Sequence, residues 1–318
     1  MGIISKDIAK AKSLLESEEL VAIPTETVYG LAGNIFSEKA IKSIFATKKR
    51  PFFNPLIVHI PNPSHLKTVV AQVPEKAQKL ANKFWPGPLT LVLPKKKNIP
   101  SLITAGKNTV AVRVPNHPMT LELLNYLDFP LAAPSANPFG SISPTNAEHV
   151  ERYFSKQIKM VLDGGDCERG IESTIVGFDE ENPIVYRLGS TSLEDIQQCI
   201  GPVEIMTKKE TSPEAPGMLE RHYAPSTATM VCEHISKAIM AHPNKKLGVI
   251  SLQEPKQEIN VDELIILSKT GNLHEAAKNL YKALHELDAL DLDLIIIEQM
   301  PKHGLGLTLN DRIKRATK

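Results

Sequence analysis

The sequence predicts an α/β protein built from two domains. Over residues 1–205, apolar strand-sized runs alternate with amphipathic helical patterns. Residues 207–217 then lack periodicity and contain two prolines and a glycine, which is the composition of a linker. The alternation restarts afterwards, and 318 residues exceed a comfortable single domain. We therefore expect a first domain over residues 1–205, a linker over 206–228 and a second domain over 229–318.

The elements of the first domain are predicted from apolar periodicity and from residues that start or stop helices. Residues 8–15 form an amphipathic helical pattern, and residues 20–23 form a strand that ends at Pro24. Ser37 is the expected N-cap of a helix whose apolar stripe runs to Lys48. The other expected elements are strands at 56–60, 89–93, 109–114 and 131–133, a helix at 75–84, helices opened by capping boxes at Thr145 and Thr191, and a hairpin of strands 173–178 and 184–188. Together they predict a twisted mixed sheet.

The second domain repeats a simpler alternation. Strands are expected at 229–232, 247–251, 264–268 and 294–298, with helices at 234–240 and 273–287. Strands that alternate with helices predict a small, parallel, Rossmann-like α/β domain.

Charge and cysteine content exclude several classes of protein. Residues 1–205 hold 22 Lys and Arg against 21 Asp and Glu, and residues 206–318 hold 15 against 15. This balance gives no broad basic surface for nucleic acid. The three cysteines form no Cys-x-x-Cys pair, which argues against a disulfide framework or zinc knuckle and favours a reducing cytoplasm. No signal peptide or membrane-spanning run is recognised, so we expect a cytoplasmic protein without membrane contact.

Familiar catalytic motifs are missing from the sequence. There is no G-x-x-x-x-G-K-[ST], no G-x-G-x-x-G after a strand, no H-E-x-x-H and no G-x-S-x-G. If the protein is an enzyme, it carries no covalent nucleophile motif that can be named.

A cluster of cations instead indicates an anion site. Lys48, Lys49 and Arg50 end one helix, and the simplest explanation is that they complement its dipole. Arg113 and Arg187, however, lie within other predicted strands. Five sequence islands fit a pocket for several negative charges: residues 24–30 with Thr27, residues 48–54 followed by His59, Arg113, residues 134–145 with Ser135, Asn137 and Ser143, and residues 172–174 with Arg187.

Each island also has a structural explanation. Thr27 could form a turn, His59 could be a satisfied structural residue, and Arg113 could face solvent. The prolines around residues 134–138 could merely stiffen a turn, and Arg187 could pair at the surface with Glu172 or Asp179. Taken together, the islands predict a basic, hydroxyl-rich pocket that many anions would suit.

The islands resemble a known family. The motifs that carry the resemblance are Ile23-Pro24-Thr25-Glu26-Thr27-Val28-Tyr29-Gly30-Leu31, Lys48-x-Arg50-Pro51 with Asn54-Pro55-Leu56, Trp85-Pro86-Gly87-Pro88-Leu89-Thr90, Arg113-Val114-Pro115, Ser135-Ala136-Asn137 and Ile171-Glu172-Ser173-Thr174. They resemble the YrdC-type threonylcarbamoyl-AMP synthases over about residues 5–200. Residues 216–225 look like the linker of the longer, two-domain form.

The resemblance implies a nucleotidyltransferase that makes threonylcarbamoyl-AMP and pyrophosphate from L-threonine, bicarbonate or CO2, and ATP. Mg²⁺ is expected on the phosphates, without a dedicated carboxylate cage. Other proteins would then transfer the threonylcarbamoyl group to tRNA. By resemblance, Lys48 and Arg50 are catalytic, and L-threonine is bound by Thr27, His59, Arg113 and Ser173. The residues expected to bind ATP are Arg50, Asn54, Thr109, Ser135, Asn137, Ser143, Arg187 and Tyr223.

Three alternatives stay open at this point. Residues 216–225 are expected to close over the pocket as a lid, although they could form a plain tether. The chain could be an RNA-binding module without turnover, although its aromatic content of 5% is low for base stacking. It could also be a carbamoyl-adenylate-forming enzyme of hydrogenase maturation, although it lacks the zinc-binding cysteine pairs of that class.

Overall fold

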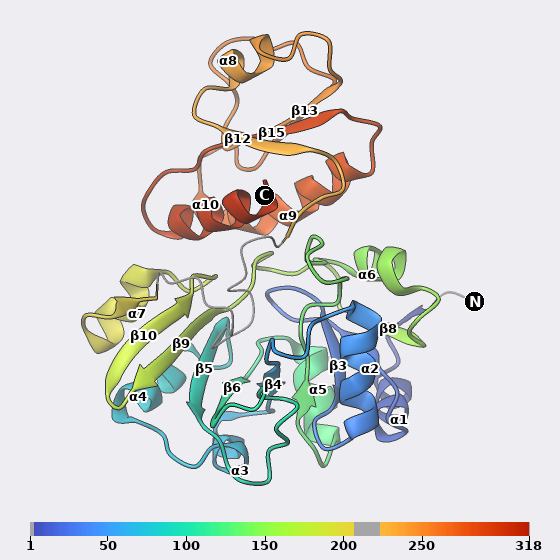
Figure 1. Cartoon of the computed structure of the whole chain (residues 1–318), viewed down its shortest axis with the longest axis vertical. Helices are drawn as coiled ribbons and strands as arrows, with labels where there is room; N and C mark the ends of the chain where they lie inside the picture. The colour runs from blue at the N-terminus through green and yellow to red at the C-terminus, as the bar shows by residue number, and fades with distance from the viewer. Residues whose placement is uncertain (1–2, 207–222, 318) are drawn as a thin grey trace.

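The computed structural model describes residues 3–206 and 223–317. These residues form two β-sheets, each with its own helices, and the smaller sheet lies above the larger domain in Figure 1. The larger sheet is mixed and the smaller one is parallel, as the sequence predicts. The α/β fold class is therefore confirmed. Most of the expected linker, residues 207–222, lies outside the described residues, and the domain boundaries stay a prediction.

The larger sheet has the strand order β1-β8-β2-β3-β7-β4-β6-β5-β9-β10-β11. Its strands are β1 (Ile4–Ser5), β2 (Val21–Ile23), β3 (Gly30–Asn34), β4 (Ile57–His59), β5 (Leu89–Pro94), β6 (Thr109–Arg113), β7 (Leu131–Ala132), β8 (Met160–Leu162), β9 (Thr174–Asp179), β10 (Asn182–Arg187) and β11 (Glu204–Ile205). β9 and β10 form the predicted antiparallel hairpin. β4 and β6 are parallel neighbours whose register sets His59 beside Arg113. Two predicted site residues are thus brought together by strand pairing.

The helices around this sheet are α1 (Ile8–Glu16), α2 (Glu38–Lys48), the 3-10 turn η1 (Pro63–His65), α3 (Leu66–Val69), α4 (Glu75–Phe84), α5 (Pro118–Tyr126), α6 (Ala147–Phe154) and α7 (Leu193–Ile200). α2 begins as predicted, because the Ser37 hydroxyl oxygen accepts a hydrogen bond from the Ala40 N–H. The turn η1, helices α3 and α5, and strands β1, β3, β8 and β11 were not predicted.

Two predicted capping boxes are wrong by one residue. α6 is capped by Asn146 and α7 by Ser192, rather than by Thr145 and Thr191. The reason at Thr191 is tertiary: its hydroxyl donates a hydrogen bond to the Pro88 carbonyl at 3.2 Å. Side chains committed elsewhere cannot cap the helix.

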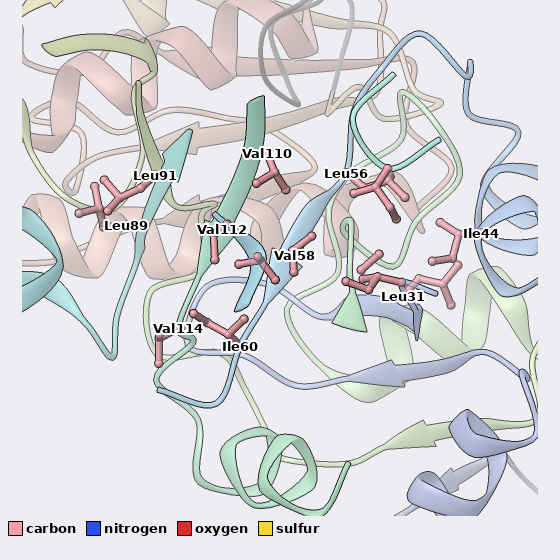
Figure 2. Close-up of a cluster of buried hydrophobic side chains, with 14 of the residues drawn as sticks. Leu31, Ile44, Leu56, Val58, Ile60, Leu89, Leu91, Val110, Val112 and Val114 are labelled. Atoms are coloured by element: carbon pink, nitrogen blue, oxygen red, sulfur yellow. The ribbon is translucent and has the colours of Figure 1, made fainter. Parts of the chain in front are cut away.

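Both faces of strand β6, which carries Arg113, are buried in the first domain. Figure 2 shows Val110, Val112 and Val114 packed among the apolar side chains of β4 and β5, as the alternation predicts. On the opposite face, Ala111 joins a smaller buried cluster. Arg113 lies on this face too, yet only 4% of it is exposed. The alternative of a solvent-facing Arg113 is therefore wrong.

The second sheet has the order β12-β15-β13-β14, and all its strands are parallel. Its elements are β12 (Thr229–Cys232), α8 (Ile235–Met240), β13 (Leu247–Ser251), β14 (Glu263–Ile266), α9 (Leu273–Asp288), β15 (Leu294–Glu298) and α10 (Leu305–Ala316). Helix α10 was not predicted. Leu294 and Ile296 pack toward α8, whereas Ile295 and Ile297 pack toward α9 and α10. In Figure 1, α9 and α10 lie on the side of this sheet that faces the larger domain.

One hydrophobic cluster crosses between the domains. The side chains of α9 and α10 pack in the same buried cluster as Val28, Ile142 and Ile171 of the first domain. Polar groups reinforce it, since the His285 ring stacks on His149 with centroids 3.8 Å apart. The two domains therefore share one buried apolar cluster.

This stacked histidine pair predicts acid sensitivity. Burial lowers the pKa of His149 to about 3 and that of His285 to about 4. The folded pKa values lie below the value of about 6.5 in an unfolded chain, so the unfolded state binds protons that the folded state excludes. We expect the free energy of unfolding to fall as the pH decreases from about 6.5 toward 4.

Chemical denaturation across this pH range measures the effect. His149→Phe keeps a ring in the stack and removes a titrating group, so its decline in stability should be shallower. His274→Asn, at an exposed position on α9, should keep the wild-type slope. Equal slopes for wild type and His149→Phe would contradict the assignment.

Candidate active site

A cavity lies where the end of β4, the end of β6 and the loops before β3 and β9 meet. Its volume is about 50 Å³. Its lining consists of Thr25, Thr27, Val28, Gly30, Arg50, Ile57, His59, Arg113, Ala133, Pro134, Ser135, Glu172, Ser173, Arg187 and Tyr223. Eight residues of the predicted site are among them: Thr27, Arg50, His59, Arg113, Ser135, Ser173, Arg187 and Tyr223. All four side chains predicted to bind threonine therefore converge on one cavity.

Three guanidinium groups line this cavity. Arg50 is held by Asn54, whose Oδ1 accepts from Nη2 at 2.6 Å, and by the Pro55 carbonyl at 2.8 Å. Burial, with a further contribution from Arg187, lowers the pKa of Arg50 to about 9. Burial likewise lowers the pKa of Arg187. Confining like charges away from water is unfavourable, so a bound anion would stabilise this arrangement.

Arg113 is oriented by a carboxylate that the sequence analysis did not single out. Its Nη2 lies 2.7 Å from Oε1 of Glu26, and both side chains are almost fully buried. The approach is an ion pair rather than an aligned hydrogen bond, because neither atom has a hydrogen-bonding partner of good geometry. The other Glu26 oxygen, Oε2, accepts from the Asn116 N–H at 2.9 Å. Glu26 lies within the family motif of residues 23–31, and this motif is the feature of the sequence that could have identified it.

His59 is a neutral side chain beside these charges. Burial, and then the neighbouring Arg113, lowers its pKa to about 3. Its Nδ1 is buried and has no hydrogen-bond partner among the described residues. A buried orphan nitrogen costs free energy unless something binds it. A ligand donor could satisfy this nitrogen, although a hydrogen bond with the Ile57 backbone also acts on the ring, so the alternative of a structural His59 stays open.

Hydroxyl groups complete the lining. The Thr25 and Thr27 hydroxyl oxygens lie 2.8 Å apart, and Thr25 Oγ1 also donates to the Val28 carbonyl. Ser173 Oγ lies 2.8 Å from Thr90 Oγ1, and Arg187 Nη2 donates to the Ser173 carbonyl at 2.8 Å. These contacts fix the hydroxyls before any ligand binds.

Lys48 lies beneath the cavity rather than in its lining. Its Nζ donates to the carbonyl oxygens of Ser135 and Asn137, each at 2.5 Å, and only 1% of the residue is exposed. Burial, and then Arg50, lowers its pKa. In this structure Lys48 fixes the loop that presents Ser135. Its catalytic role stays a prediction.

Four further predicted residues also lie outside the lining. Asn54 holds Arg50, and Thr109 begins β6 at the end opposite to Arg113. Asn137 Nδ2 donates to the carbonyl oxygens of its own loop. The Ser143 hydroxyl donates to Glu172 Oε1 at 2.7 Å. Their assignment to ATP stays a prediction.

Glu172 corrects an alternative drawn from the sequence. Pairing of Arg187 with Glu172 at the surface is wrong, because only 7% of Arg187 and 6% of Glu172 are exposed. Glu172 Oε2 instead accepts hydrogen bonds from Tyr281 and Arg312 of the second domain. Burial alone would raise the Glu172 pKa, but Arg312 and Arg187 outweigh it and the pKa is lowered. The sequence analysis missed Tyr281 and Arg312, because no local pattern links residues so distant along the chain.

Breaking the pair between Glu26 and Arg113 should be costly. Glu26→Gln leaves a buried guanidinium without its counter-charge, which should lower the free energy of unfolding by about 3–5 kcal/mol. Urea denaturation measures this change. Glu19→Gln is the matched control, because Glu19 pairs with Lys159 at the surface and should change stability by about 1 kcal/mol or less. Equal losses in the two variants would contradict the buried ion pair.

Comparison with known proteins identifies the family. Residues 13–189 match the family model named Sua5_yciO_yrdC, described as "Telomere recombination", and residues 191–317 match the model described as "Threonylcarbamoyl-AMP synthase, C-terminal domain". The threonylcarbamoyl-AMP synthase of Pyrococcus abyssi is 41% identical, with 96% of this chain and 93% of that protein covered. The synthase of Bacillus subtilis is 39% identical, with coverages of 97% and 92%.

A solved structure agrees. The crystal structure of P. abyssi Sua5 complexed with L-threonine has a TM-score of 0.91 and 40% identity, and covers 99% of this chain and 96% of that chain. The resemblance found in the sequence is confirmed, and this chain belongs to the threonylcarbamoyl-AMP synthase family in its two-domain form.

Proposed function

We propose that the cavity lined by Arg50, Arg113 and Arg187 is where this enzyme makes threonylcarbamoyl-AMP from L-threonine, bicarbonate or CO2, and ATP. The observation that carries this proposal is the convergence of three buried guanidinium groups from separate elements on one cavity. The enzyme is a nucleotidyltransferase, as its family membership shows.

The chemistry explains why such a site suits the reaction. Carboxylation of the threonine amine by bicarbonate forms a carbamate and releases water. A carbamate oxygen then forms a bond to the α-phosphorus. The bond between the α-phosphorus and the oxygen that bridges the α- and β-phosphates breaks, so that pyrophosphate leaves. Both reactants are anions, so positioning and charge compensation are the main contributions a protein can make.

The residues divide by the part of the cavity they line. For threonine we propose Thr27, His59, Arg113 and Ser173. Arg113 suits the carboxylate because its planar fork makes two-point contacts. For ATP we propose Arg50, Ser135, Arg187 and Tyr223 from the lining. The sequence also predicts Asn54, Thr109, Asn137 and Ser143 for ATP, and we keep them as proposed residues outside the lining.

Mg²⁺ is proposed to enter with the triphosphate as part of the substrate. In residues 3–206 and 223–317, no three His, Cys, Asp or Glu side chains gather in a way that could hold a metal ion. Glu26 and Glu172, the carboxylates nearest the cavity, are each paired with an arginine. These side chains do not fit a resident metal site.

Tyr223 supports the lid hypothesis. Its ring lines the cavity, and the next residue, Ala224, donates its N–H to the Gly140 carbonyl at 2.9 Å. Small-molecule sites usually enclose about 300–1,000 Å³, so a cavity of about 50 Å³ must widen before ATP and threonine can enter. Movement of Tyr223 would widen it. Residues 216–222 lie outside the described residues, so the extent of the lid, and the alternative of a plain tether, stay open.

The alternatives are less well supported. A binding module without turnover would not explain membership of an enzyme family over nearly the whole chain. A hydrogenase-maturation enzyme would not explain the match of residues 191–317 to the synthase C-terminal domain.

We further propose that separate transfer proteins carry the product to tRNA. No helix among the described residues is long and apolar enough to cross a membrane.

Substrate dependence tests the function directly. Pyrophosphate release from ATP should require threonine and bicarbonate together, because the attacking carbamate contains both. Release is measured with each co-substrate alone and with both. Serine is a useful comparison, since it lacks only a methyl group. Release that is indifferent to threonine or to bicarbonate would rule the proposal out.

Arginine truncations test the site. Arg50→Ala and Arg113→Ala should each slow synthesis by about two to three decades, equivalent to roughly 2–4 kcal/mol of lost transition-state stabilisation. Thermal unfolding and steady-state rates are measured on the same samples. Arg169→Ala is the control, because the Arg169 side chain is 40% exposed. Near-wild-type turnover in both cavity variants would contradict the assignment.

A further inference from the structure

Arg312 of α10 is a buried cation of the second domain that contacts the wall of the cavity. Its side chain is 0% exposed, and its Nε donates to Glu172 Oε2 at 2.9 Å. Its Nη2 donates to the Leu188 carbonyl at 2.6 Å, beyond the end of β10. Its guanidinium carbon lies 4.9 Å from the centre of the Tyr223 ring. Arg312 therefore contacts two residues of the cavity wall without lining the cavity itself.

Glu172 is an unexpected group in a wall that would receive phosphates. It lines the cavity together with Arg50 and Arg187, and a free carboxylate there would repel an anion or pair with either arginine. In the structure both of its oxygens are engaged. Oε1 accepts from Ser143, whereas Oε2 accepts from Arg312 and from the Tyr281 hydroxyl at 3.0 Å.

Resting on the function proposed above, we propose that Arg312 is a positioning residue for ATP binding. It neutralises Glu172 and turns that carboxylate toward the second domain, so that Glu172 does not compete with the nucleotide for Arg50 and Arg187. It also supports the ring of Tyr223. The second domain is thus a part of the nucleotide site, although its sheet lies apart from the cavity.

Electrostatics favours a role of Arg312 in ATP binding over a role only in holding the two domains together. The continuous apolar cluster of α9, α10 and the first domain already holds them together. A buried ion pair adds little net stability compared with apolar packing. Removing only Arg312, however, would release the buried carboxylate to its remaining cationic neighbour, Arg187, whose charge already influences it.

The test compares the Michaelis constants for ATP and threonine in the full-length enzyme. Arg312→Met should raise KM for ATP at least tenfold and change KM for threonine by less than about threefold. The double variant Glu172→Gln/Arg312→Met removes both charges and should return KM for ATP to within about threefold of wild type. Tyr281→Phe, which removes one uncharged donor to Glu172, should raise KM for ATP more weakly. Equilibrium binding of an ATP analogue with a methylene α–β bridge should follow the same order.

The control is Lys314→Met, which removes a charge from an exposed position on the same helix and should leave both constants unchanged. If Arg312→Met does not fold, Arg312→Gln takes its place, because it removes the charge and keeps a polar side chain, and the same selective rise in KM for ATP is expected. Equal rises in both constants, or a double variant no better than Arg312→Met, would overturn the proposal. Absence of product in wild type would instead overturn the proposed function.

Discussion

Burial of several cations around one space is the constraint on which the rest of the structure depends. Arg50, Arg113 and Arg187 are each less than 8% exposed, yet all three line one cavity. Buried charges persist only where oxygen atoms surround them. The chain supplies those oxygens from distant segments: the Asn54 amide for Arg50, the Glu26 carboxylate for Arg113 and the Ser173 carbonyl for Arg187. The fold therefore has to hold these segments in register.

Sheet pairing is the means by which that register is set. The parallel alignment of β4 with β6 fixes His59 beside Arg113, and the antiparallel hairpin of β9 and β10 returns Arg187 to the residue that precedes β9. Loops then need a separate support, which Lys48 supplies at the end of α2. A cation committed to two carbonyl oxygens organises the Ser135 loop as firmly as a strand would. This explains why a lysine can matter to the site without facing a ligand.

The sequence predicted what local rules determine. Ser37, Gly201 and the alternating valines of β6 are recognisable from their neighbours alone, and α2, α7 and β6 followed from them. Recognisable motifs likewise identified the eight predicted residues that line the cavity. Contacts between residues far apart along the chain could not be predicted from the sequence. Asn146 and Ser192 became caps because the neighbouring threonines had other partners, and α10 was missed because it starts with glycines, of which Gly306 has no room for a side chain beside Pro301. Glu172 and Arg312 meet only in the folded chain.

The ion pair between Glu172 and Arg312 indicates what the second domain contributes physically to the cavity. A cavity made wholly from arginines would be too costly to desolvate, and a carboxylate in its wall moderates the charge when no substrate is bound. The same carboxylate would oppose the arriving phosphates, so it needs a partner outside the cavity. Arg312 and Tyr281 are such partners, and both come from helices that the small sheet supports. The buried arginines of the first domain, Arg50, Arg113 and Arg187, all line the cavity, so the cation that pairs with Glu172 from outside the cavity comes from the second domain.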